Sequence, residues 1–200
     1  FAHEENALVV RGADQAAFAA LLRREHFSAE PSEVSAEEAR LPILLRYPGL
    51  REHFETQGWA TDFGDGPYMM SPVLFQNIYK GALGEVAGAY ILQQELGLRL
   101  QEIDDPSTFE RFDFAGPDGL WFDFKHWKSG TRQDEEAVRR KTLDKLDAVG
   151  GRRAFLINLI ADPAFRSSCT KDERLVEIPG LLLPDGTVNR QAMRYLGRYL

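Results

Sequence analysis

The sequence predicts an α/β protein with a mixed central sheet flanked by helices. A hairpin pattern over residues 112–127, with Pro117-Asp118-Gly119 as its turn, precedes a charged amphipathic segment at 132–149. That segment precedes a nearly continuous apolar run at 154–160, typical of a strand buried on both faces. An antiparallel meander followed by a helical crossover to a buried strand gives a mixed sheet with helices on its faces.

The first 75 residues predict a helical accessory region. Apolar side chains recur at helical spacing over residues 14–24, and Ser35-Ala36-Glu37-Glu38 resembles a capping box that opens a helix toward Leu44. Residues 48–72 are rich in Gly, Pro and aromatic residues, so we expect loop with short helical pieces there. Region 1–75 carries no motif with a chemical interpretation.

Residues 76–200 predict the α/β domain, in which helical and strand patterns alternate. Gly150-Gly151 is expected to stop the helix between the hairpin and the buried strand. The expected elements are a helix at 76–96, strands at 98–103, 108–115 and 120–127, a helix at 132–149, strands at 154–160 and 175–178, and a helix at 189–200.

Two acidic residues and one lysine occupy neighbouring positions of the hairpin. Because successive side chains of a strand point to opposite faces, Asp123 and Lys125 share one face. Asp113 on the preceding strand is expected to lie on one face, with Phe112 and Phe114 on the other. Pairing the strands can therefore group two carboxylates and one ammonium, which suits a divalent cation and a phosphate. An ordinary cross-strand ion pair on an exposed sheet face is the alternative.

This arrangement resembles the PD-(D/E)XK nuclease superfamily. The core of that family runs α-β-β-β-α-β, and its signature is an acid, a hairpin and then Asp/Glu-x-Lys on the next strand. Asp113 and Asp123-Phe124-Lys125 match the signature, and Glu85 matches a glutamate that many members carry on the preceding helix. Phe112 stands where the proline of the family would precede the first acid. The resemblance covers residues 76–160 and implies a restriction-endonuclease-like fold.

The resemblance also implies a Mg²⁺- or Mn²⁺-dependent nuclease that hydrolyses DNA phosphodiester bonds. Its catalytic residues would be Glu85, Asp113, Asp123 and Lys125. The metal ligands would be Asp113, Asp123 and the main-chain carbonyl of Phe124, with Glu85 contributing directly or through water. Lys125 would orient or help deprotonate the attacking water and would offset charge in the transition state.

Glu85 lies between two glycines of its helix. Gly81 and Gly88 stand at i−4 and i+3 from Glu85 and share its face. Each glycine costs a helix interior roughly 1 kcal/mol relative to alanine. Such a cost suggests that the helix approaches the sheet closely, which would let Glu85 reach the metal. A packing stripe of small residues, with Glu85 at its edge, is the alternative.

Charge is distributed unevenly along the chain, whose formal net charge is −7. Residues 125–200 carry 15 basic and 10 acidic side chains, a net +5, whereas residues 1–124 carry 9 and 21, a net −12. The basic part begins at the suspected site, and both a nucleic-acid partner and ordinary solvated helix faces stay open as its explanation. The candidates for nucleic-acid contact are Gln133, Arg139, Lys141 and Trp127.

The remaining features concern the setting of the protein. No apolar run is long enough to span a bilayer, and one cysteine, Cys169, excludes an internal disulfide, so we expect a cytoplasmic protein without a membrane partner. The chain begins with Phe1, so we expect it to belong to a longer multidomain protein. The resembled modules occur in restriction, repair and phage-defence systems, and double-strand cutting would require two sites and hence a homodimer.

Three functions stay open at this point. The first is the DNA endonuclease, with DNA favoured over RNA. The second is a non-catalytic nucleic-acid-binding or assembly module on the same fold. The third is a metal-dependent hydrolase of a small phosphodiester, for which no nucleoside-pocket signal exists in the sequence.

Overall fold

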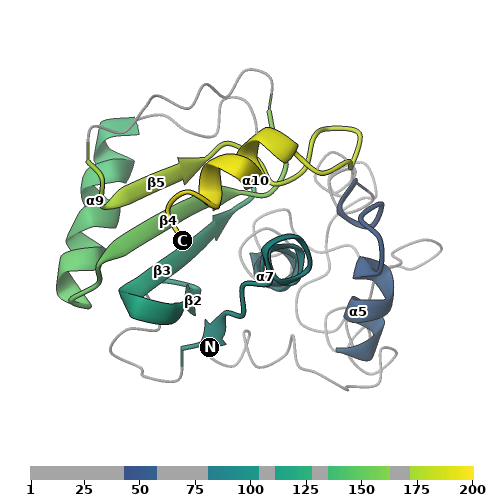
Figure 1. Ribbon diagram of the computed structural model, residues 1–200, viewed down its shortest axis with the longest axis horizontal. Coiled ribbons are helices and arrows are strands. Elements are labelled where there is room, and N and C mark those ends of the chain that lie inside the picture. The colour runs from purple at the N-terminus through teal and green to yellow at the C-terminus, as the bar shows by residue number, and fades with distance from the viewer. Residues whose placement is uncertain (1–42, 58–80, 104–110, 128–134, 163–171) are drawn as a thin grey trace, which may run out of the picture. The chain divides into compact units, whose positions relative to one another are not determined.

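The computed structural model describes residues 43–57, 81–103, 111–127, 135–162 and 172–200, and in these it shows an α/β architecture (Figure 1). The chain divides into two compact units, Phe1–Val86 and Ala87–Leu200. The first unit contains α5 (Leu50–Thr56), and α7 (Gly81–Leu96) begins in the first unit and ends in the second. The helix predicted at 14–24 and most of the helix predicted at 35–44 lie outside the described residues.

The second unit is built on a mixed five-stranded sheet with strand order β1-β2-β3-β4-β5. The first three strands pair antiparallel, and β3, β4 and β5 pair parallel. The α/β class and the mixed sheet predicted from the sequence are therefore confirmed. The elements are β1 (Gln101–Glu102), β2 (Phe114–Ala115), β3 (Leu120–Lys125), α9 (Glu135–Ala148), β4 (Arg153–Asn158), β5 (Leu175–Ile178) and α10 (Arg190–Leu196).

Helix α9 covers one face of this sheet. Leu146 of α9, Leu156 of β4 and Leu175 of β5 belong to one buried apolar cluster, against which Trp121 of β3 packs. The helix ends in a Schellman motif, because Gly150 adopts φ 61° and the N–H of Gly151 donates to the carbonyl of Leu146 at 3.0 Å. The predicted stop at these glycines is confirmed.

The opposite face of the sheet is aromatic. The rings of Phe122 on β3 and Phe155 on β4 stack with centroids 4.7 Å apart. Gly88 of α7 lies directly against the ring of Phe124, so closely that a Cβ at this position would overlap the ring. The close approach of this helix to the sheet, predicted from its glycines, is therefore confirmed at Gly88. Arg153, which points to the same face as Phe155, donates to the carbonyl of Tyr199 just after α10.

Phe112 and Phe114 do not share a face, contrary to the prediction. The ring of Phe114 packs edge-on against Phe124, whereas Phe112 packs on Trp121 in the cluster beneath α9. The physical reason is local: β2 begins only at Phe114, and the chain bends at Asp113. The strict alternation of a strand therefore does not extend back to Phe112.

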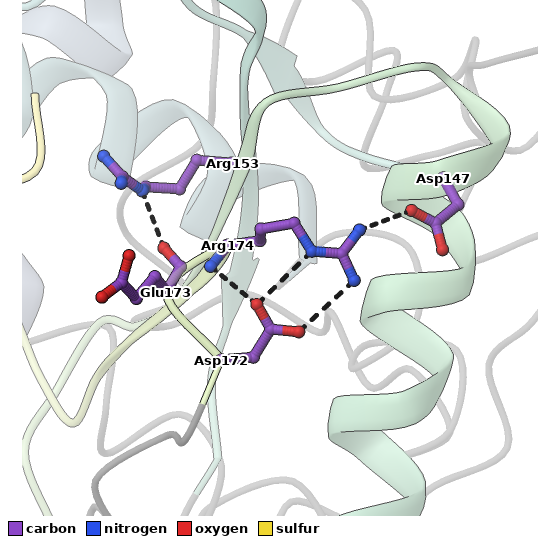
Figure 2. A network of polar contacts seen from close by, with 5 residues as sticks. All are labelled: Asp147, Arg153, Asp172, Glu173 and Arg174. Carbon is purple, nitrogen blue, oxygen red and sulfur yellow. Dashed lines mark hydrogen bonds and ion pairs between the residues drawn. The ribbon is translucent and has the colours of Figure 1, made fainter.

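An exposed ion-pair network joins the start of β5 to the end of α9 (Figure 2). Arg174 donates from its side chain to Asp147 at 2.7 Å and to Asp172 at 3.3 Å. The main-chain N–H of Arg174 also donates to Asp172, and this hydrogen bond, with the side-chain one, lowers the pKa of the Asp172 carboxyl. The favourable effect of the carboxylate is present at neutral pH, is lost as the pH falls through the lowered pKa, and is small because the site is solvated.

Candidate metal and phosphate site

Asp123 is a buried carboxylate with a lysine on each oxygen. Its residue is 3% exposed, in the middle of a sheet whose face α9 covers. The ammonium of Lys125, two residues along the same strand, contacts Oδ1, and that of Lys145 on α9 lies 3.4 Å from Oδ2. Asp123 and Lys125 share a face, as the period of the strand predicted. A carboxylate buried in this way is stable only with charged or coordinating partners, because burial removes its hydration.

The carboxylate of Asp113 lies beside the same strand. Its Oδ2 accepts a hydrogen bond of 2.6 Å from the main-chain N–H of Phe124, while its own N–H donates to the carbonyl of Phe122 at 2.9 Å. The side chain therefore replaces a main-chain carbonyl in the β2–β3 ladder. This contact places Asp113 next to the middle residue of Asp123-Phe124-Lys125.

The main-chain carbonyl of Phe124 points toward Asp113 rather than toward β4. In an antiparallel pair, the N–H and C=O of one residue point to the same side of the strand. The N–H of Phe124 bonds to Asp113, and the neighbouring carbonyl of Lys125 instead accepts from Leu159 after β4. The Phe124 carbonyl and the Asp113 carboxylate are thus on the same side of β3, as the proposed ligand set requires.

The donors of this region are oxygen atoms of the type that hard divalent cations bind. Two carboxylates and one carbonyl supply the oxygen ligands that Mg²⁺ and Mn²⁺ prefer, and Mg²⁺ usually keeps several waters rather than a full protein cage. Within the described residues, no group of three or more His, Cys, Asp or Glu side chains could hold a metal ion. Two carboxylates and one carbonyl would leave most coordination positions of such a cation to water.

Asn158 holds the ends of three strands together at this edge of the sheet. It is 1% exposed at the end of β4. Its Nδ2 donates to the carbonyls of Trp127, Ile160 and Pro179 at 2.9–3.2 Å, and its Oδ1 accepts from the N–H of Trp127 at 2.8 Å. Trp127 follows β3 and Pro179 follows β5, so one side chain fixes the backbone immediately after the Asp123–Lys125 strand.

A second buried acid lies under α9. Glu177 of β5 occupies the same row of the sheet as Asp123, because Asp123 pairs with Leu156 and Leu156 pairs with Glu177. It is 6% exposed, and its Oε2 accepts from Nε of Arg139 on α9 at 3.1 Å. Helix α9 thus supplies a cation to each of two buried carboxylates.

The predicted nucleic-acid contacts have different environments. Arg139 contacts Glu177 and also Glu135, so its charge is engaged within the fold, whereas Lys141 is exposed on α9. Trp127 packs partly buried against the cluster beneath α9. Gln133 lies outside the described residues.

Glu85 stays a predicted site residue. It belongs to α7 in the first compact unit, whereas Asp113, Asp123 and Lys125 belong to the second. The division of the protein at residue 75 likewise stays a prediction.

Three polar residues of the site region were not predicted from the sequence: Lys145, Asn158 and Glu177. Lys145 stands within the helical stripe formed with Val138, Thr142 and Val149, which is otherwise half-buried or buried. A lysine in such a stripe, like an asparagine or glutamate inside an apolar strand, signals a buried polar partner. The identity of that partner depends on the sheet register and cannot be read locally.

Comparison with known proteins adds no family to this description. No protein-family model matches the chain, and no curated protein matches its sequence. Among the residues that the structure describes, no helix is long and apolar enough to cross a membrane.

Proposed function

We propose that this chain is a Mg²⁺- or Mn²⁺-dependent nuclease of the PD-(D/E)XK type that hydrolyses DNA, as an endonuclease module of a restriction, repair or phage-defence system. The order α7, β1, β2, β3, α9, β4 supports the proposal, because it follows the α-β-β-β-α-β core of that family. The observation that carries the proposal is the pairing of buried Asp123 with Lys125 on one strand, beside the carboxylate of Asp113.

The proposal gives each residue of the signature a role. Asp113, Asp123 and the carbonyl of Phe124 would hold the cation, and Glu85 stays a candidate ligand from the sequence pattern. A bound cation would supply an activated water and would neutralise charge on the scissile phosphate. Lys125 orients that water and offsets the charge that develops on the phosphate, a task for which a compact ammonium is suited.

Cleavage assays with plasmid, single-stranded DNA and single-stranded RNA test the proposal. We expect wild-type protein to cut DNA with Mg²⁺ or Mn²⁺ and not with EDTA. Asp123→Asn and Lys125→Met should each lower the rate by at least about 10²-fold, the usual range for loss of a residue that handles a proton. Asp144→Asn, which changes an exposed acid of α9, should keep the wild-type rate. The proposal fails if wild-type protein shows no metal-dependent cutting, or if cutting survives in Asp123→Asn.

A second candidate is the non-catalytic binding or assembly module. It is favoured by one observation: both oxygens of Asp123 have lysine partners inside the fold, as they would in a purely structural ion-pair network. Calorimetric titration with Mn²⁺ separates the two candidates. No binding, or binding that is indifferent to Asp113→Asn, would favour the module.

A further inference from the structure

Lys145 contacts the central carboxylate of the site from a different element. Its Nζ lies 3.4 Å from Oδ2 of Asp123, and it extends from α9, whereas Lys125 lies on β3 with Asp123 itself. A cation that binds Asp123 needs one of the two oxygens that the lysines contact. A cation at Oδ2 would lie beside the ammonium of Lys145 at the same oxygen, and the two positive charges would repel each other.

We propose that Lys145 competes with the divalent cation for Oδ2 of Asp123, and that it withdraws toward the ring of Phe112 when the metal binds. This inference rests on the proposed metal site. It adds that the ammonium of Lys145, a cation belonging to the protein itself, lowers the affinity of the site for the metal ion.

Three observations identify Lys145, rather than Lys125, as the residue that withdraws. Lys145 makes the longer contact, whereas Lys125 is held beside Asp123 by their spacing on one strand. Its ammonium already lies 5.7 Å from the centroid of the Phe112 ring, a face that attracts cations. Its side chain is 23% exposed, so part of it is already in contact with water.

The charges of the site explain why Lys145 lowers the metal affinity. Asp113 and Asp123 carry two negative charges, and Lys125 and Lys145 carry two positive ones. A divalent cation added to this balanced set meets the repulsion of both ammonium groups, which the water at their partly exposed side chains weakens but does not remove. Removal of Lys145 eliminates one repulsion and vacates Oδ2. We expect Mn²⁺ to bind roughly tenfold more tightly as a result.

Calorimetric titration of the full chain with Mn²⁺ tests this expectation. Lys145→Met and Lys145→Gln should each bind Mn²⁺ about tenfold more tightly than wild type. Arg140→Met removes an exposed positive charge from the same helix and should change the affinity by less than about twofold, because solvent screens it. Thermal unfolding of each variant shows whether the fold is retained.

A second test uses only the wild-type protein and so does not require that the variants fold. Lysines are acetylated briefly with acetic anhydride, with and without Mn²⁺, and quantified by mass spectrometry. Acetylation of Lys145 should rise severalfold with Mn²⁺, whereas that of exposed Lys141 should stay constant.

The outcomes separate the inference from the proposed function. If wild type binds Mn²⁺ but the Lys145 variants bind no more tightly and acetylation of Lys145 does not rise, the inference is wrong and the metal site stands. If wild type binds no Mn²⁺ at millimolar concentration, the proposed function fails, and the inference fails with it.

Discussion

Asn158 shows how a single side chain determines the geometry of the candidate site. Its amide group reaches three carbonyls and one N–H that belong to the segments after β3, β4 and β5. The residue is 1% exposed, so the amide, and not bulk water, contacts these groups. The position of Trp127, directly after the strand of Asp123 and Lys125, therefore depends on this amide.

Substitution of Asn158 should destabilise the protein strongly. Asn158→Leu retains an apolar stem but leaves buried carbonyls and an N–H without their partner, so the free energy of unfolding should fall by about 3 kcal/mol. Asn158→Asp keeps the shape and removes the donors, and should cost a similar amount. Urea unfolding measures both variants. Gln93→Leu, an exposed amide on α7, should stay within about 0.5 kcal/mol of wild type, and a wild-type stability for Asn158→Leu would contradict the assigned role.

At the scale of single residues, the sequence predicts pairs of side chains within one strand better than it predicts contacts between different elements. The shared face of Asp123 and Lys125 follows from the two-residue period alone. The contact of Lys145 with Asp123 spans 22 positions, and that of Asn158 with Trp127 spans 31. These contacts depend on where α9 crosses the sheet and on the register of the strands. The spacing of residues within one element reveals neither the crossing point nor the register.

Helix α7 contains a position at which packing requires a residue that helix propensity disfavours. Alanine is favoured over glycine in a helix interior by roughly 1 kcal/mol, so propensity alone would disfavour Gly88. The ring of Phe124 occupies the space that a Cβ would need. The glycine is thus required by the distance between the helix and β3.

We therefore expect Gly88→Ala to destabilise the protein in spite of its better helix propensity. Overpacking of a close contact costs about 1–3 kcal/mol, which should exceed the gain from propensity and lower the melting temperature. Phe124→Leu should recover part of the loss when combined with Gly88→Ala, so the two effects should not add. Thermal unfolding of the single and double variants measures this coupling. Strict additivity, or a stabilised Gly88→Ala, would show that the ring does not limit the approach.

At the scale of elements, the predicted bounds agree with the structure for most of the second unit, with β1 and β2 as the exceptions. The bounds of β5 agree with the prediction, and those of α9, β4 and α10 agree within a few residues of it. The strands β1 and β2 span two residues each and were predicted to be longer. The side chain of Asp113 explains part of this difference, because it takes the place of main-chain pairing at the start of β2. A propensity rule does not anticipate such a replacement.

At the scale of the whole molecule, basic and acidic residues are separated along the sequence. This separation determines which part of the chain would attract a polyanion such as DNA. The chain carries −7 overall, but residues 125–200 carry +5. The Debye length at physiological ionic strength is about 8 Å, so DNA at the surface responds to local rather than net charge. The structure further divides the basic residues of α9 into those engaged by buried acids, such as Arg139, and exposed ones, such as Lys141.

This division predicts how salt should affect DNA binding. Measured in the Asp123→Asn background to prevent cutting, the logarithm of the affinity should fall with the logarithm of salt concentration with a slope of about −3 to −5, as expected for a few phosphate contacts. Lys141→Gln should reduce the magnitude of the slope by about 1 and leave stability unchanged. Arg139→Gln should leave the slope unchanged and lower the free energy of unfolding by about 2–3 kcal/mol, because the buried carboxylate of Glu177 would lose a charged hydrogen-bond donor. Fluorescence anisotropy at several salt concentrations measures the slope, and urea unfolding of the same variants measures the free energy of unfolding.

Two outcomes would contradict this prediction. A slope near zero would exclude phosphate binding as the basis of recognition. A slope that responds to Arg139 but not to Lys141 would reverse the assignment of the two residues.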